Sequence, residues 1–340
     1  MTREEGDSSS FEAQLGTTAN SDVPPAGVID PLDAAGRPTD PRAMSTSTLH
    51  ASCLCGNVRW EVSGPLTQPD PNRDDPMSLL SMSHCHCSRC RKAHGAPYAT
   101  YLVAPESAFQ ITAGREHIVR WASSAAMFRP FCGTCGSVVP DGAAWNGLVG
   151  MPAGNFDEDP GVVPRCHIFV ASRAPWVEIH DDLPRFDAYP DVLGMPAMET
   201  RAPLDPATGE PRGSCLCGGV TFVVTAPPLR SRTCHCGRCR KAGSAAHMSY
   251  LVTTLDGVRV TRGEALLVTY KVPEAQFFTH AFCRSCGSSM PRKSAERGIT
   301  IVPLGAMDDD PGIRPGSHIF VGSKAAWDVI TDDLPQFAEA

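Results

Sequence analysis

Residues 85–92 of this chain read CHCSRCRK, so three cysteines stand within six positions and two basic residues follow them. The same pattern returns as CHCGRCRK at residues 234–241. The chain of 340 residues holds 15 cysteines, and its start, MTREEGDSSS, lacks the basic and apolar stretches of a secretory signal. We therefore expect a cytoplasmic protein whose thiols hold metal or carry out chemistry rather than form disulfides.

Most of the sequence occurs twice. Three further blocks return in the same order around the cysteine-rich stretch: ASCLCGNVRWEV (51–62) as GSCLCGGVTFVV (213–224), RPFCGTCGSVVP (129–140) as HAFCRSCGSSMP (280–291), and RCHIFVASRAPWVEIHDDLPRF (165–186) as GSHIFVGSKAAWDVITDDLPQF (316–337). Self-similarity of this kind indicates a tandem duplication. The first copy alone carries residues 67–79, whose prolines and charges predict a surface loop that could alter access to the first copy's site.

The repeat sets the expected domain organisation. Residues 1–48 are polar and poor in large apolar side chains, which predicts a disordered tail. Two domains are expected, over residues 49–187 and 213–340, and the proline-rich residues 188–212 are expected to link them. The two copies could also face each other as an internal pseudo-dimer.

Charge and hydrophobicity exclude two classes of partner. The net charge is -7, whereas proteins that mainly bind a nucleic-acid backbone usually present clustered positive charge. No apolar run reaches the roughly 18 residues that a membrane-spanning helix needs. We therefore expect neither nucleic acid nor a membrane among the partners.

Short alternating segments predict a mainly β domain in each copy. The candidate strands are VRWEV (58–62), VTFVV (220–224), YLV (101–103 and 250–252), FQIT (109–112), VRVT (258–261), HIVRW (117–121), LLVTY (266–270) and HIFV (167–170 and 318–321). Long helical periodicity is missing, and the best candidate for a short helix begins within C-x-x-C-R-K.

Seven cysteines in each copy divide by spacing into four and three. A C-x-x-C followed by glycine resembles a zinc knuckle, in which a tight turn points two sulfurs at one ion. The C-x-C pair beside the first strand can supply the other two ligands, because residues i and i+2 face the same way. The expected structural zinc sites are Cys53, Cys55, Cys132 and Cys135 in the first copy, and Cys215, Cys217, Cys283 and Cys286 in the second.

The middle cysteines then form triplets. These are Cys85, Cys87 and Cys90 in the first copy, and Cys234, Cys236 and Cys239 in the second. Three protein ligands and one open position are typical of a catalytic zinc. Alternatively, a histidine closes the fourth position and makes the site structural. The candidates are His86 and His235 within the triplets, and His167 and His318 further along the chain.

Basic residues follow each triplet, and two interpretations of them stay open. Arg91 and Lys92 return as Arg240 and Lys241. They could offset the negative charge of three thiolates on one ion, or they could bind a substrate carboxylate. We expect Trp176 and Trp327 to pack at domain edges. Cys166, which serine replaces at position 317, is expected to be a plain buried thiol.

The combination C-L-C-G-x-V, C-H-C-x-R-C-R-K and F-C-x-x-C-G-S resembles the glutathione-dependent formaldehyde-activating enzyme family, which also includes centromere protein V. The resemblance covers both copies. It implies a Mss4-like fold, a structural zinc at the C-x-C and late C-x-x-C cysteines, and a second zinc at the triplet. It also implies a carbon–sulfur lyase activity that joins glutathione and formaldehyde to S-(hydroxymethyl)glutathione or splits this adduct.

The sequence therefore predicts an enzyme with four zinc ions per chain, two in each domain. A small thiol would enter the open position of a triplet site and add to an aldehyde, and His86, His167, His235 and His318 are the candidate acids. The alternative is a non-catalytic, zinc-stabilised binding or scaffold module. A third hypothesis is storage or sensing of zinc or electrophiles by the cysteine triplets.

Overall fold

The computed structural model describes residues 48–64, 66, 76–124, 127–191 and 204–339. The predicted disordered tail, apart from Thr48, lies outside the described residues, as do residues 67–75 of the predicted surface loop and 192–203 of the predicted linker. Residues Ser45–Ala340 form one compact unit, which contains both copies of the repeat. The boundaries between the two expected domains stay predictions.

The first copy contains three small sheets and a short α-helix. Its elements are β1 (Leu49–Ser52), β2 (Arg59–Val62), the 3-10 helix η1 (Pro76–Leu80), β3 (Met82–Cys85), α1 (Ser88–His94), β4 (Ala99–Pro105), β5 (Phe109–Ala113), β6 (Ile118–Ser124), β7 (Met127–Cys132), β8 (Leu148–Pro152), the 3-10 helix η4 (Ala153–Asn155), β9 (His167–Ile168) and β10 (Arg185–Phe186). The strand orders are β1-β2-β5, β10-β9-β3-β4-β8 and β6-β7. Strands β3, β9 and β10 run parallel to one another, and the other pairs are antiparallel.

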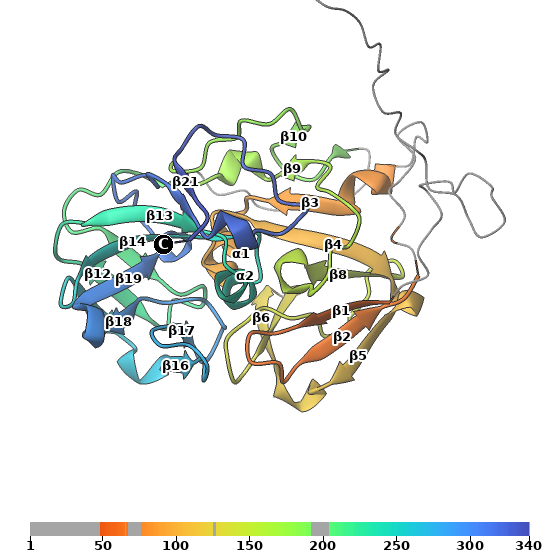
Figure 1. Cartoon of the computed structure of the whole chain (residues 1–340), viewed down its shortest axis with the longest axis horizontal. Helices are drawn as coiled ribbons and strands as arrows, with labels where there is room; N and C mark the ends of the chain where they lie inside the picture. Colours follow the sequence, from red (N-terminus) through yellow and green to blue (C-terminus); the bar gives the residue numbers. More distant parts are fainter. Residues whose placement is uncertain (1–47, 65, 67–75, 125–126, 192–203, 340) are drawn as a thin grey trace, which may run out of the picture. The chain divides into compact units, whose positions relative to one another are not determined.

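The second copy repeats this arrangement and adds one strand (Figure 1). Its elements are β11 (Arg212–Ser214), β12 (Thr221–Val224), β13 (Arg230–Cys234), α2 (Gly237–Gly243), β14 (Met248–Thr254), β15 (Val258–Arg262), β16 (Leu267–Lys271), β17 (Thr279–Cys283), β18 (Arg292–Ser294), the 3-10 helix η8 (Ala295–Arg297), β19 (Ile299–Pro303), the 3-10 helix η9 (Leu304–Ala306), β20 (His318–Ile319) and β21 (Gln336–Phe337). The strand orders are β11-β12-β15, β18-β19-β14-β13-β20-β21 and β16-β17. The extra strand β18 pairs with β19.

The mainly β prediction is confirmed, and the helix begins where the cysteine spacing placed it. The segment HIFV, however, forms a strand over only its first two residues in each copy. Phe169 and Phe320 adopt left-handed backbone angles, with φ of 59° and 57°, and a 3-10 turn follows each of them. Left-handed phenylalanine is uncommon, so the apolar pattern gives no warning that the strand ends there.

Each hydrophobic core takes a tryptophan from the other copy. Trp327 packs into the first copy's core beside Trp60 and Phe156. Trp176 packs into the second copy's core beside Phe222. Both tryptophans are structural, as expected, but they cross between the copies rather than closing the edge of their own. The two cores therefore depend on each other.

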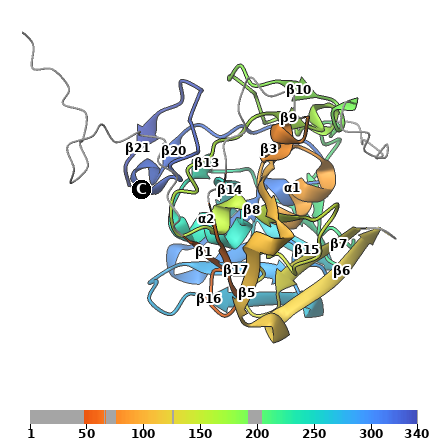
Figure 2. The ribbon, with the colours of Figure 1, turned by 90° about the vertical axis from the view of Figure 1, so that its right-hand side faces the viewer.

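The two α-helices lie where the copies meet (Figure 2). Arg91 on α1 donates to the backbone carbonyls of Gly305 and Met307 at 2.9 and 3.0 Å, and Arg240 on α2 donates to that of Gly154 at 3.4 Å. Residues 91 and 240 are equivalent positions of the repeat, and so are 154 and 305. The contacts therefore follow an approximate twofold symmetry, as in the isologous interface of a dimer.

The glycine after each C-x-x-C motif also contributes to the contact between the copies. Gly136 and Gly287 have φ of 80° and 74°, which favours glycine in any case. A Cβ at Gly136 would lie 2.5 Å from Cγ of Phe282, and a Cβ at Gly287 would lie 2.5 Å from Cγ of Phe131. The two phenylalanine rings meet edge to face, with centroids 6.5 Å apart. Each knuckle turn thus leaves room for an aromatic ring of the other copy.

Within the described parts of the chain, no helix has the length and apolarity that a membrane span requires.

Replacing Trp327 with alanine is expected to lower the free energy of unfolding of the whole unit by about 3–5 kcal/mol, because a large buried side chain leaves the core of the other copy. Urea denaturation measures this change, and we expect one cooperative transition for both copies. Trp145→Ala is the matched control, since this tryptophan is 44% exposed and the change should cost far less. Two separate transitions, of which only one shifts, would contradict the shared core.

Candidate metal centres

The first four-sulfur cluster forms where two turns meet. Cys53 and Cys55 lie in the turn between β1 and β2, Cys132 ends β7, and Cys135 follows it. The four sulfurs all lie within 4.8 Å of one another. The Sγ atoms of Cys53 and Cys55 are 3.4 Å apart, and those of Cys55 and Cys132 are 3.7 Å apart. The structure thus brings together the four cysteines that the spacing had grouped.

The second copy repeats this cluster with Cys215, Cys217, Cys283 and Cys286, again within 4.8 Å of one another. The Sγ atoms of Cys215 and Cys217 are 3.3 Å apart, and those of Cys217 and Cys283 are 3.8 Å apart. Segments more than sixty residues apart therefore deliver four sulfurs to one point in each copy.

The geometry and the donor set both fit zinc. Zinc–sulfur bonds of about 2.3 Å in a tetrahedron place the sulfurs roughly 3.8 Å apart, close to the separations in both clusters. Backbone N–H groups also face the sulfurs: Val58 donates to Cys53 at 3.3 Å, and Val220 donates to Cys215 at 3.2 Å. These features favour the thiolate form that a metal needs.

The two triplets also form clusters. The sulfurs of Cys85, Cys87 and Cys90 lie within 4.8 Å of one another, as do those of Cys234, Cys236 and Cys239. Among the described residues, no histidine, carboxylate or further cysteine joins either group at that distance. Each triplet therefore offers three protein ligands, as the spacing predicted.

A helix N-terminus shapes each triplet. Cys87 is the N-cap of α1, and its sulfur accepts a hydrogen bond from the backbone N–H of Cys90 at 3.3 Å. Cys236 caps α2 in the same way, with Cys239 as donor at 3.4 Å. Sulfur thus takes the place that serine or aspartate usually holds at an N-cap, which explains why the helix begins inside the motif.

The four candidate histidines form two buried pairs rather than ligand positions. His86 Nε2 lies 2.8 Å from His167 Nδ1, and His167 Nε2 lies 3.0 Å from a carboxylate oxygen of Asp181. In the second copy His235 Nε2 lies 2.8 Å from His318 Nδ1. Since His86 and His235 are fully buried, their imidazoles point into the protein and away from solvent.

The second pair carries an additional acid. His318 bonds to Asp332 at 3.0 Å, which matches the first copy, and His235 also bonds to Asp328 at 3.1 Å. Burial raises the pKa of Asp328, but the hydrogen bond from His235 and the nearby imidazoles outweigh it and leave the pKa of this carboxyl below its usual value. The acids at 181 and 332 belong to the DDLP segments. Each acid stands 14 positions after the histidine that it contacts, in both copies, and this repeated spacing could have indicated the histidine–aspartate contacts.

A tyrosine and a histidine join the two copies beside these pairs. Tyr98 Oη lies 3.1 Å from His247 Nε2, and these two residues occupy equivalent positions of the repeat. The ring of Tyr98 contacts that of His86, and the ring of His247 contacts that of His235, with centroids 5.1 and 4.9 Å apart. A buried series of imidazole and phenol rings therefore runs from one copy into the other. Sequence reasoning missed both residues, because tyrosine and histidine at matched positions give no motif.

The basic residues proposed for substrate recognition face the other copy. Lys92 Nζ lies 2.6 Å from Asp308, and Lys241 Nζ lies 2.5 Å from Asp157. Together with the arginine contacts described above, these bonds direct the charged groups of Arg91, Lys92, Arg240 and Lys241 across the joint between copies. Their geometry gives the substrate-carboxylate interpretation no support.

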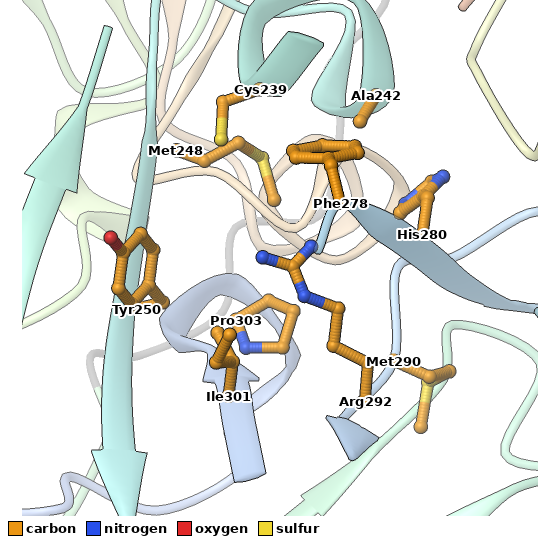
Figure 3. Close-up of a pocket in the computed structure, with 10 residues that line it drawn as sticks. All are labelled: Cys239, Ala242, Met248, Tyr250, Phe278, His280, Met290, Arg292, Ile301 and Pro303. Carbon is orange, nitrogen blue, oxygen red and sulfur yellow. The ribbon is translucent and has the colours of Figure 1, made fainter. Parts of the chain in front are cut away.

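Other arginines approach the triplets. In the first copy, Arg129 Nη1 lies 3.5 Å from the sulfur of Cys90, and Arg129 is largely buried. In the second copy, Arg292 and Cys239 line a small cavity with a volume of about 20 Å³, room for about one water molecule (Figure 3). Tyr250 lines the same cavity. Sequence reasoning missed both arginines, because they stand at positions that do not correspond in the repeat.

Cys166 lies apart from the metal ligands. It is buried, and its thiol donates to the backbone carbonyl of Leu79 at 3.3 Å. Burial raises the pKa of this thiol to about 11, so it is protonated at neutral pH. The geometry agrees with the expectation of a plain buried thiol.

Both copies of the repeat, with their cysteine clusters, match a known protein family. A family model described as glutathione-dependent formaldehyde-activating enzyme matches residues 48–172 and 210–323, which together make up more than half of the chain. The chain belongs to this family. Each copy of the repeat matches the formaldehyde-activating family separately, so the tandem duplication and the two domains of this family are confirmed. The four cysteine clusters fit the metal binding inferred from the motifs.

Two further comparisons add little to the family assignment. No curated protein matches this chain. A crystal structure of a Rhodobacter sphaeroides protein, determined as a structural genomics target, is 26% identical over 31% of this chain and 97% of that chain, with a TM-score of 0.25.

Cys132→Ser is expected to remove one metal ion per chain and to destabilise the first copy, because a structural zinc contributes folding free energy directly. Metal analysis by mass spectrometry and far-ultraviolet circular dichroism measure the two effects. Cys166→Ser is the matched control, since serine stands at the equivalent position 317, and it should leave the metal content unchanged. Equal metal content in the two variants would contradict the cluster assignment.

Acid is expected to destabilise the joint between copies through His247. Burial lowers the pKa of this imidazole from its ordinary 6.5 to about 4, so between these values the unfolded chain binds more protons than the folded one. The contribution is fully present above pH 6.5 and is lost as the pH falls, by about 2 kcal/mol at pH 5. Urea denaturation at pH 7 and 5 measures the loss.

His247→Gln should reduce the difference in stability between pH 7 and pH 5 by about this amount. Metal content must be equal at both pH values, so that loss of metal does not cause the change. An undiminished pH dependence in the variant would show that other groups are responsible.

Proposed function

We propose that this protein is a zinc-dependent carbon–sulfur lyase that acts on the adduct of a small thiol and an aldehyde. Glutathione and formaldehyde, with S-(hydroxymethyl)glutathione as their adduct, are the reactants that the family description suggests. The proposal includes four zinc ions per chain, one in each sulfur cluster.

One observation supports this proposal above all others. Each copy holds one cluster of four sulfurs and one of three, and no fourth side chain of the described residues completes the smaller one. A four-sulfur site suits a structural metal, whereas a three-ligand site leaves a coordination position for a reactant. If zinc served only to stabilise the fold, four protein ligands would be expected at both sites of each copy.

Zinc held by a triplet would supply Lewis acidity toward a thiol and toward an aldehyde oxygen. In the reaction the thiol loses its proton, a sulfur–carbon bond forms, and the carbonyl oxygen takes up a proton. Tyr250 is a candidate donor of that proton in the second copy, because it lines the same cavity as Cys239. Burial holds the pKa of this phenol above its usual value, so its O–H group is available at neutral pH.

In this proposal the four histidines position the triplets. None of them lines the cavity beside Cys239. His86 lies between Cys85 and Cys87 in sequence, and its bond to His167 links the end of β3 to the neighbouring parallel strand β9. The same link in the second copy, between His235 and His318, joins β13 to β20. Rigid strand ends hold the ligand sulfurs in the geometry that one ion requires.

A second candidate function is a non-catalytic scaffold stabilised by zinc. The small volume of the cavity beside Cys239 favours it, because no whole thiol peptide fits inside. Tight pairing of the two copies through buried side chains also suits a rigid binding module. Turnover distinguishes the two functions.

The full-length, zinc-loaded protein should consume formaldehyde faster than the uncatalysed reaction when a small thiol is present. The double variant Cys87→Ser/Cys236→Ser should keep the fold and lose this activity, because it disrupts both triplets and leaves both four-sulfur clusters intact. Formaldehyde consumption with a panel of thiols measures turnover, and circular dichroism checks the fold.

Two outcomes would count against the enzyme. Formaldehyde consumption no faster than in buffer would leave the scaffold as the better explanation. Full activity in the double variant would place the chemistry outside the triplets.

A further inference from the structure

We infer that the two triplet centres have diverged, and that the centre of the second copy binds the thiol substrate through a carboxylate held by Arg292. This inference rests on the proposed function, because it assigns that function to one of two sites. It follows from three differences between equivalent positions of the copies.

The first difference is the cation beside the triplet. In the first copy Arg129, largely buried, places Nη1 3.5 Å from the sulfur of Cys90. The equivalent residue in the second copy is His280, whose Nδ1 bonds to the carbonyl of Cys135 at 2.7 Å and whose Nε2 bonds to Ser289 at 2.9 Å. A guanidinium thus contacts a sulfur of the first triplet, whereas the residue at the equivalent position of the second copy bonds to Cys135 and Ser289 instead.

The second difference is the leucine that precedes the strand leading into each triplet. Leu79 and Leu80 of η1 pack in the hydrophobic cluster that contains Cys85 and Cys90. Leu79 belongs to the segment that only the first copy has. At the position equivalent to Leu80 the second copy has Leu229, which is 55% exposed. The leucine of the first copy therefore packs in the cluster that contains its triplet, whereas its equivalent in the second copy is exposed.

The third difference is a guanidinium of the second copy that has no carboxylate partner. Arg292, at the start of β18, lines the cavity beside Cys239, and its guanidinium lies over the ring of Phe278 at 4.9 Å (Figure 3). It donates to the carbonyl of Thr279, and no carboxylate of the described residues pairs with it. At the equivalent position the first copy has Asp141, which pairs with Arg120 at 2.6 Å.

Arg292 and Cys239 could bind two groups of one ligand. The triplet would bind its sulfur, and the guanidinium would bind its carboxylate. Arginine binds carboxylates through two parallel N–H donors, which fixes orientation as well as charge. The cavity itself has room for a molecule of the size of water or formaldehyde. The larger body of the thiol would therefore lie outside the cavity, with its carboxylate on Arg292 at the rim.

Isothermal titration calorimetry on the full-length, zinc-loaded protein tests the inference without relying on turnover. Two thiols serve as probes: glutathione, which carries carboxylates, and cysteamine, which carries none. Arg292→Gln should weaken glutathione binding roughly 10- to 100-fold, the usual effect of losing hydrogen bonds to a charged group, and should leave cysteamine binding unchanged. The wild type should bind one glutathione per chain.

Arg297→Gln is the matched control, because this exposed arginine of η8 lies on the same copy and should leave both thiols unaffected. Metal analysis confirms that both variants keep the zinc content of the wild type. Unchanged glutathione binding in Arg292→Gln, an equal loss for both thiols, or two equivalent glutathione sites per chain would each overturn the inference. A wild type that binds neither thiol would overturn the proposed function, and the inference with it.

Discussion

The whole architecture depends on sulfur atoms that must meet at one point although the chain carries them far apart. Cys55 and Cys132 lie 77 positions apart in sequence, yet their sulfurs are 3.7 Å apart. Such a constraint fixes the relative position of two turns more firmly than packing alone could in so small a sheet. The strands of the described residues, each two to seven residues long, are therefore arranged around the sulfur clusters.

The sequence predicted the clusters well because metal ligation is a local and discrete requirement. A thiol at the wrong spacing cannot reach the ion, so C-x-C and C-x-x-C-G carry geometric information that hydrophobic patterns lack. The strands that flank these motifs were predicted separately, from the alternation of apolar and polar residues. Where geometry depended on one unusual backbone angle, as at Phe169, the pattern predicted a longer strand than the chain forms.

The contacts between the copies could not be predicted from the residues that make them. Arg91 and Lys92 stand beside a triplet in sequence, which favoured a role at the metal, but their side chains bond to the other copy. These groups lie on a helix of seven residues whose N-cap is the sulfur of Cys87. Long-range partners of this kind have no local signature. Differences between equivalent positions, such as Arg129 and His280, are visible in the sequence. Only the structure shows that Arg129 contacts a triplet sulfur and that His280 bonds elsewhere.

The exchanged tryptophans have a consequence for how this chain arose and how it assembles. Each copy presents a tryptophan and receives one, so a single ancestral copy with the same surfaces could complete its core only by pairing with a second chain. Fusion of the two copies turns that encounter into an intramolecular event, whose effective concentration is set by the connecting segment and no longer by protein abundance. Dilution would separate such a pair of chains, but it does not separate the two copies of the fused chain.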